Sequence, residues 1–203
     1  MKITLVDYGA GNVTSVDRAL RKLGAETIRA TTADCISRAE ALLLPGVGHF
    51  GAFVRAIDQR NMRSPLLDAI GRGVPFLGIC LGLQALYASS EEAPDLAGLN
   101  LLPGTICELP RSVKLPHMGW NQVRPSRSSR LLDGIEPGAH FYFAHSYAAM
   151  ADAQDLAAVA TCEHGTQFIA ILESRSVFAV QFHPEKSGPA GAQLLKNFLR
   201  LAA

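Results

Sequence analysis

A nine-residue stretch, FLGICLGLQ at 76–84, constrains the fold of this chain more than any other part of the sequence. An apolar run ends on Cys80, a pattern with helical spacing follows at once, and glycines stand two residues away on each side, at Gly78 and Gly82. A strand that turns straight into a helix needs small residues beside its turn residue, so that the two arms do not clash. The pattern predicts a nucleophile elbow with a thiol at its tip. The alternative is a structural cysteine buried at a strand end, and the stretch alone leaves both readings open.

The composition is that of a globular chain without an obvious charged partner. The chain has 203 residues, 48% of them hydrophobic, 18% charged, and a formal net charge of +1. This length suits one domain over 1–203, and the charge indicates neither nucleic acid nor an anionic membrane as a partner. No apolar stretch approaches the roughly 18 residues of a spanning helix. The four cysteines form no C-x-x-C pair, so neither a disulfide framework nor a metal site is predicted, and we expect a cytoplasmic protein.

Strand and helix patterns alternate in the first half of the chain. Strands are expected at 2–7, 26–30, 41–44 and 74–79, and helices at 13–23, 53–60, 66–72 and from Leu81 through Leu86. The second half shows shorter strands, including a pair at 156–161 and 167–172, and a last strong strand at 177–182 before a terminal helix. The chain is therefore predicted to be α/β, with a mostly parallel central sheet, helices on both faces and an antiparallel extension.

Three loops carry glycines or unusual side chains. The turn at 8–12, YGAGN, resembles the start of a dinucleotide fingerprint, but Thr14 stands where the third glycine belongs, so a tight turn is the better interpretation. The segment PGVGHFG at 45–51 follows a strand and can turn its backbone amides outward, or it is an ordinary loop. The segment KLPHMGWNQ at 114–122 is predicted to be a loop, and its residues His117, Met118 and Trp120 form either a core anchor or a partner-facing patch.

The last strand delivers His183 and Glu185, two residues apart on extended chain, so their side chains leave the same face. A carboxylate there can hold one ring nitrogen while the other nitrogen faces a nucleophile. Parallel α/β sheets place their sites at the carboxyl edge, where Cys80, the 45–51 loop and His183 would meet. The three features together indicate a cysteine nucleophile with a histidine base.

With these motifs the chain resembles the class I, triad-bearing glutamine amidotransferases, a flavodoxin-like family, over its full length. The resemblance rests on DYGAGN at 7–12, PGVGHFG at 45–51, GICLGLQ at 78–84, PHMGWN at 116–121, YFAHSY at 142–147 and FHPEKSG at 182–188. It implies that Cys80 attacks the side-chain amide of glutamine, His183 moves the proton and Glu185 orients His183. It further implies an oxyanion hole from Leu81 and the Val47–Gly48 peptide, with that peptide able to flip. Glutamine would be held by residues in three segments, namely Gln84, Glu92, His145, Ser146 and Tyr147.

DYGAGN and PHMGWN point to one branch of this family, in which the glutaminase supplies ammonia to a separate, barrel-shaped cyclase subunit. That cyclase makes imidazole glycerol phosphate and an aminoimidazole carboxamide ribotide in histidine biosynthesis. The resemblance implies a heterodimer with no cofactor. Five residues would lie at the interface with the cyclase or near the ammonia exit: Asn12, Met118, Trp120, Tyr142 and Lys186.

Three alternative functions account for the sequence less well. The glutaminase of another ammonia-channelling synthase, of the pyridoxal phosphate type, does not account for PHMGWN. A non-catalytic interaction module on the same fold does not account for intact Cys80, His183 and Glu185. A cysteine peptidase or chaperone-like hydrolase has no reason to combine Gln84 with the sequence HSY at 145–147.

Overall fold

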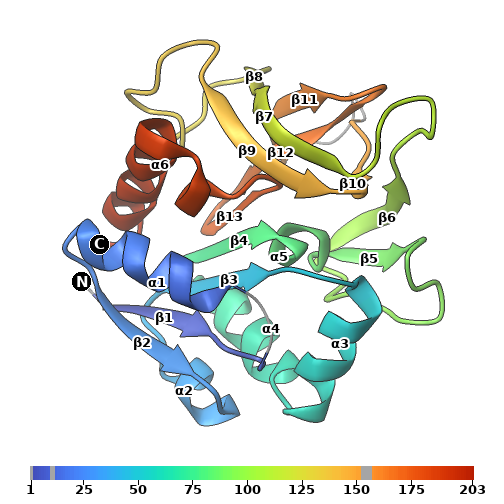
Figure 1. The fold of residues 1–203 in the computed structure, drawn as a ribbon. Helices are drawn as coiled ribbons and strands as arrows, with labels where there is room; N and C mark the ends of the chain where they lie inside the picture. The colour runs from blue at the N-terminus through green and yellow to red at the C-terminus, as the bar shows by residue number, and fades with distance from the viewer. Residues whose placement is uncertain (1, 10–11, 152–156) are drawn as a thin grey trace.

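A computed structural model describes residues 2–9, 12–151 and 157–203, and its largest element is an eight-stranded sheet in the order β2-β1-β3-β4-β13-β12-β11-β8 (Figure 1). The first five strands in this order are parallel, and the remaining three continue the sheet antiparallel. The parallel part has the strand order of flavodoxin-like folds. The fold class predicted from the sequence is confirmed. The strands are β1 (Lys2–Val6), β2 (Glu26–Ala30), β3 (Leu42–Gly46), β4 (Phe76–Cys80), β8 (Arg124–Pro125), β11 (Ala158–Glu163), β12 (Gln167–Ser174) and β13 (Val177–Val180).

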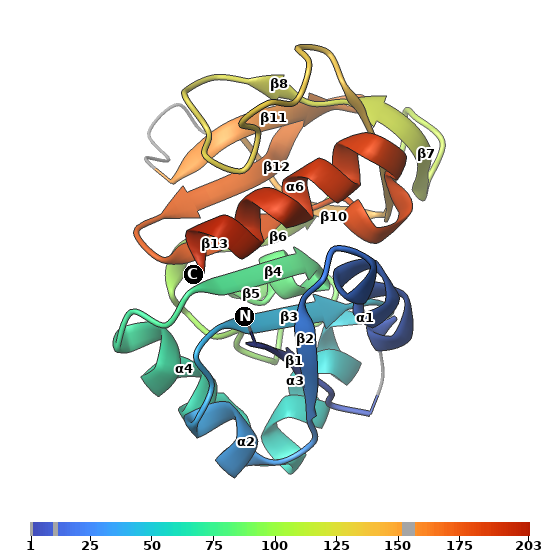
Figure 2. The same cartoon turned by 90° about the vertical axis from the view of Figure 1, so that its left-hand side faces the viewer.

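Helices cover both faces of the sheet, because its central strands are apolar on both sides. Leu43 belongs to a core cluster with side chains of α1 (Val13–Lys22) and α6 (Gly188–Leu201), and Figure 2 shows α6 lying across the strands. Its neighbours Leu42 and Leu44 point the other way, as expected for alternating side chains. They belong to a second cluster that includes residues of α2 (Ala33–Ser37), α3 (Phe50–Gln59), α4 (Arg63–Gly71) and α5 (Leu81–Gln84).

Two smaller sheets complete the carboxyl edge of the main sheet. One joins β5 (Tyr87–Ser90), β6 (Leu102–Glu108) and β10 (Tyr147–Ala149). The other is an antiparallel ribbon of β7 (His117–Gln122) and β9 (His140–His145), called the β7–β9 ribbon below. A short 3-10 helix, η1 (Pro184–Lys186), connects β13 to α6.

The observed local structure differs from the expectations in several places. The helix after Cys80 ends at Gln84, and Tyr87 already begins strand β5. The segment 114–122 is not a loop, because six of its residues pair with β9 as strand β7. The short helix α2 was not expected. The strand expected from Leu156 begins at Ala158 as β11, and Leu156 lies outside the described residues.

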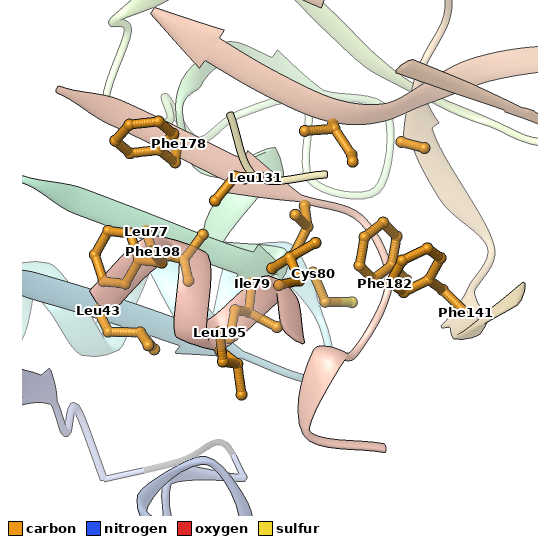
Figure 3. Close-up of a cluster of buried hydrophobic side chains, with 14 of the residues drawn as sticks. Leu43, Leu77, Ile79, Cys80, Leu131, Phe141, Phe178, Phe182, Leu195 and Phe198 are labelled. Atoms are coloured by element: carbon orange, nitrogen blue, oxygen red, sulfur yellow. The ribbon is translucent and has the colours of Figure 1, made fainter. Parts of the chain in front are cut away.

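The core on the α6 side reaches as far as the predicted nucleophile. Figure 3 shows Cys80 at the end of β4, with Ile79 beside it and Phe182 on the neighbouring segment. Phe182 stacks on Phe141 of β9 with ring centroids 4.2 Å apart. This contact packs the β7–β9 ribbon against the segment that leads from β13 to His183.

Candidate active site

The elbow at Cys80 has the geometry that its sequence predicts. Cys80 has φ +55° and ψ −106°, a conformation that side-chain-bearing residues rarely adopt. A Cβ on Gly78 would come within 2.6 Å of the Gly82 carbonyl oxygen, and a Cβ on Gly82 would overlap the Leu44 carbonyl oxygen. Both glycines are therefore required by close packing of the backbone, and the strained turn thrusts the thiol beyond the end of β4.

His183 lies between Cys80 and Glu185. Its Nδ1 is 2.9 Å from the Glu185 Oε1, and both side chains are buried. Burial alone would lower the pKa of His183, but hydrogen bonds and charge interactions with Cys80 and Glu185 raise it to about 10. A basic histidine beside a thiol is the proton acceptor that a cysteine nucleophile needs. Asn12 adds a longer contact, with its Nδ2 3.4 Å from the same Glu185 oxygen.

The structure brings the predicted oxyanion and substrate residues together around one cavity of about 730 Å³. Cys80 and His183 line it. All the residues expected to stabilise the oxyanion or bind glutamine line it as well: Val47, Gly48, Leu81, Gln84, Glu92, His145, Ser146 and Tyr147. A cavity of this size and polarity, open next to a nucleophile and a base, suits a small polar substrate.

The two glycines of the oxyanion loop differ in what constrains them. A Cβ on Gly46 would approach the Leu81 Cβ to 2.6 Å, so Gly46 is fixed by packing against the elbow. Gly48 has φ +92° and open space around its Cα. Gly48 therefore allows the Val47–Gly48 peptide to reorient. Gly46 pairs with Cys80 in the β3–β4 register and anchors the loop there.

Several of the predicted glutamine-binding groups are engaged within the protein. The Gln84 Nε2 donates to the Tyr147 carbonyl oxygen at 2.7 Å, and Glu92 accepts from the Phe50 amide at 2.6 Å. Burial lowers the pKa of His145 to about 3, so this ring is neutral. These contacts shape the cavity wall and hold its segments in register.

Three polar residues around the site were not assigned to it from the sequence. Gln181 is fully buried and has its Nε2 3.6 Å from the Cys80 sulfur. Ser187 donates to the His183 carbonyl oxygen at 2.6 Å and accepts from the Tyr142 amide at 3.0 Å. His117 is hydrogen-bonded to His145. Gln181 could have been found from the sequence, because it stands two residues before His183 and residues two apart on extended chain point to the same face. The contacts of Ser187 and His117 depend on segments that are distant in sequence.

The residues expected at a partner interface form a surface beside the cavity. Met118 and Trp120 are 65% and 56% exposed on the outer face of β7, and Trp120 meets the Tyr142 ring edge-on at 6.2 Å. Lys186 lies over the same Tyr142 ring at 5.5 Å. Met118, Trp120, Tyr142 and Lys186 are called the Trp120 surface below. Asn12 and Lys186 also line the cavity, so surface and cavity are continuous.

The described residues show neither a metal-binding cluster nor a membrane-spanning helix. No group of three or more His, Cys, Asp and Glu side chains in residues 2–9, 12–151 and 157–203 is placed to hold a metal ion. Within the same residues no helix has both the length and the apolar character needed to cross a membrane.

Comparison with known proteins agrees with this geometry. The family model "Glutamine amidotransferase class-I" matches residues 4–202. "Imidazole glycerol phosphate synthase subunit HisH" of Methanothermobacter thermautotrophicus is 44% identical over 98% of both chains, and the proteins of the same name from Moorella thermoacetica and Salinibacter ruber are 43% and 42% identical. These two relatives are matched over 97% and 98% of this chain and 93% and 94% of their own lengths.

Solved structures with lower identity share the fold. A structure described as a glutamine amidotransferase superposes with a TM-score of 0.77 at 17% identity, over 98% of each chain. PurLQS from Thermotoga maritima gives a TM-score of 0.77 at 21% identity, over 98% of this chain and 97% of the other. With the family model and the close relatives, these findings establish that the chain belongs to the class I glutamine amidotransferase family, in the group of HisH subunits of imidazole glycerol phosphate synthase.

Proposed function

We propose that this chain is the glutaminase subunit of an imidazole glycerol phosphate synthase, which hydrolyses L-glutamine and delivers the ammonia to a cyclase subunit. The observation that carries the proposal is the position of His183, hydrogen-bonded to Glu185 and interacting with the Cys80 thiol at the edge of a cavity next to the Trp120 surface. The 42–44% identity with proteins named as that synthase's HisH subunit supports the choice of reaction and partner.

In the proposed reaction the Cys80 sulfur attacks the side-chain carbonyl carbon of glutamine and forms a tetrahedral intermediate. The Leu81 amide and the Val47–Gly48 peptide stabilise its oxyanion, and loss of one such donor lowers kcat by about 10²–10³-fold in comparable hydrolases. His183 gives its proton to the departing nitrogen, which leaves as ammonia. His183 then takes a proton from water, the water oxygen attacks the thioester, and the C–S bond breaks to release glutamate and the thiolate.

Glutamine sits between the elbow and the β9–β10 turn in this proposal. Gln84, Glu92 and the His145–Tyr147 segment line the same cavity as Cys80, and in this proposal they bind the backbone end of the substrate. The cyclase binds the Trp120 surface together with Asn12, so that the ammonia leaves past Tyr142 toward the partner. Exposed aromatic and methionine side chains of this kind are enriched in protein–protein interfaces. Tryptophan and tyrosine are also among the residues that contribute most of the binding energy there.

We also propose that residues 1–203 act as one domain and that the protein works in the cytoplasm. The four cysteines Cys35, Cys80, Cys107 and Cys162 are all free, which suits a reducing compartment.

The decisive experiment measures glutamine hydrolysis by the purified chain alone and with a cyclase subunit carrying its nucleotide ligand. We expect activity near background for the chain alone and a strong rise in the complex. Equal activity in both conditions would contradict the assignment to this synthase and favour an independent glutaminase. Cys80→Ala should abolish glutamine-dependent synthesis by the complex and leave synthesis from added ammonium salts intact, because the cyclase reaction needs only ammonia.

A further inference from the structure

Gln181 occupies the position next to the nucleophile on the neighbouring strand. β13 runs parallel to β4, and the last pair in register is Val180 with Ile79. The following residues, Gln181 and Cys80, therefore lie side by side where the two strands end. Gln181 is fully buried, and because it precedes His183 by two residues on extended chain, both side chains leave toward the same side.

The direction of the Gln181 amide is fixed by its hydrogen bonds. The Gln84 Nε2 is 2.7 Å from the Tyr147 carbonyl oxygen and 3.2 Å from the Gln181 Oε1. The Tyr147 backbone carbonyl oxygen can only accept a hydrogen bond, so the Gln84 atom that faces it is the NH₂ nitrogen. The Gln181 atom that faces the same NH₂ group has to be the carbonyl oxygen. The Gln181 NH₂ group then points at the Cys80 sulfur, 3.6 Å away.

The Cys80 thiolate needs such a donor because the short helix at the elbow gives it little electrostatic stabilisation. The helix that follows Cys80 has four residues, so its dipole is small compared with that of a full helix. Of the titratable groups, His183 faces the sulfur from the β13 side with Glu185 behind it, and Tyr8 interacts with it from the end of β1. Further charged or titratable groups line the same cavity, namely Glu92, His145, Tyr147 and Lys186.

An amide donor has a property that these titratable groups lack. It carries no net charge and does not titrate, so it donates to the sulfur at every pH at which the protein is folded. Hydrogen bonds to an ionised acceptor are about twice as strong as those between neutral groups, so the contact favours the thiolate over the thiol.

We propose that Gln181 is a catalytic residue of the glutaminase reaction, whose amide N–H stabilises the Cys80 thiolate and whose carbonyl oxygen links this contact to Gln84 on the substrate side of the cavity. The proposal rests on the proposed function for its reaction. Gln181 acts twice in each turnover. It holds the thiolate before attack, and it stabilises the sulfur again when the C–S bond of the thioester breaks and the electron pair returns to sulfur.

The test is the pH profile of Cys80 alkylation by iodoacetamide in the purified chain, with modification at Cys80 quantified by peptide mass spectrometry. Gln181→Met removes the donor, keeps the side-chain length and leaves Gln84 its bond to Tyr147. We expect the midpoint of the profile to rise by about one pH unit, which makes alkylation about tenfold slower below the midpoint. Gln122→Met is the matched control, because the Gln122 amide donates to the Gly138 carbonyl oxygen instead. Its profile should equal that of the wild-type chain.

A wild-type alkylation profile in Gln181→Met overturns the proposal. The assay needs neither glutamine nor cyclase, so its outcome is independent of whether the proposed function holds. If circular dichroism shows that Gln181→Met does not fold, the wild-type chain still provides a test by NMR. The side-chain amide resonances of Gln181 should then shift with the same midpoint as alkylation, and resonances that do not move between thiol and thiolate also overturn the proposal.

Discussion

The buried pair His117 and His145 predicts a loss of stability in mild acid. The His145 Nδ1 is 2.9 Å from the Tyr147 carbonyl oxygen, which can only accept, so this nitrogen carries the proton. The His145 Nε2 is therefore an acceptor for the His117 Nδ1, 3.1 Å away. Burial, with a smaller charge effect from His164, lowers the pKa of His117 to about 4, and burial lowers that of His145 to about 3. Both rings are neutral in the folded protein.

The size of the effect follows from proton uptake by the unfolded chain. An unfolded histidine has a pKa of about 6.5 and takes up most of a proton between pH 7 and pH 5. The folded pair, with pKa values of about 4 and about 3, takes up almost none in that interval. Because the unfolded state binds more protons, stability falls as the pH drops below about 6.5. Each histidine contributes a loss of about 2 kcal/mol between pH 7 and pH 5, and the pair about 4 kcal/mol.

The variant His117→Phe isolates one half of this effect. A phenyl ring preserves the stacking on His164 and Phe143, whose rings lie 4.2 and 4.8 Å from that of His117. The free energy of unfolding is measured by urea titration at pH 7 and at pH 5 for each protein, so that the contributions of all other groups cancel in the difference. We expect the loss between the two pH values to be about 2 kcal/mol smaller in His117→Phe than in the wild-type chain.

The control is His140→Phe at the other end of strand β9, where the side chain is exposed and meets water in both states. Its pH dependence should follow that of the wild-type chain. If His117→Phe loses as much stability as the wild-type chain between pH 7 and pH 5, burial does not hold His117 neutral, and the reasoning is refuted.

Two further predictions concern the Trp120 surface and the elbow. Trp120→Ala should weaken cyclase binding by about 30-fold or more in a titration, with unchanged thermal unfolding, because the side chain is 56% exposed and large aromatic anchors dominate interfaces. The control is Ile28→Ala on edge strand β2, where the side chain is 38% exposed, and it should not change the affinity for the cyclase. If Trp120→Ala also leaves the affinity unchanged, Trp120 is not part of the interface. Gly82→Ala should destabilise the chain by about 3 kcal/mol or more, since the new Cβ meets the Leu44 carbonyl oxygen. Gly71→Ala in α4, with open space around it, should be neutral or stabilise by up to about 1 kcal/mol, and similar unfolding midpoints for both variants would contradict the packing account.

The parallel half of the fold could be predicted from sequence because its signals are local. Strands β1 and β3 are followed by the amphipathic helices α1 and α3, and Gly24, with φ +84°, follows the C-cap of α1 in the conformation that favours glycine. The helix after Cys80 was predicted too long for a different reason. Residues 81–87 are all buried, and apart from Gln84 they are apolar or glycine, so the segment has the same pattern in a helix and in a buried strand.

Strand β7 was missed because the stabilising partner is remote in sequence. Pro116 and Gly119 are typical of a loop, and Gly119 has φ +135°. The segment is nevertheless extended, because six consecutive residues pair with β9 from His117 with His145 to Gln122 with His140. This pairing also decides the question that the sequence left open for the tryptophan. Trp120 lies on the outer face of the ribbon and His117 on the inner face, so Trp120 faces outward and the buried anchor is His117.

The same distinction between local and remote contacts explains what the sequence revealed of the candidate site. Cys80, His183 and Glu185 are recognisable because each stands in a short motif at a strand end. The motif alone does not make a reactive thiol. The helix at the elbow is four residues long, so its N-terminus gives a thiolate little electrostatic stabilisation. In this chain β13 places two side chains that interact with the sulfur beside β4, because the register puts Gln181 and His183 there together. A nucleophile elbow with a short helix therefore predicts a compensating donor on the neighbouring strand, which can be sought two residues before the catalytic histidine.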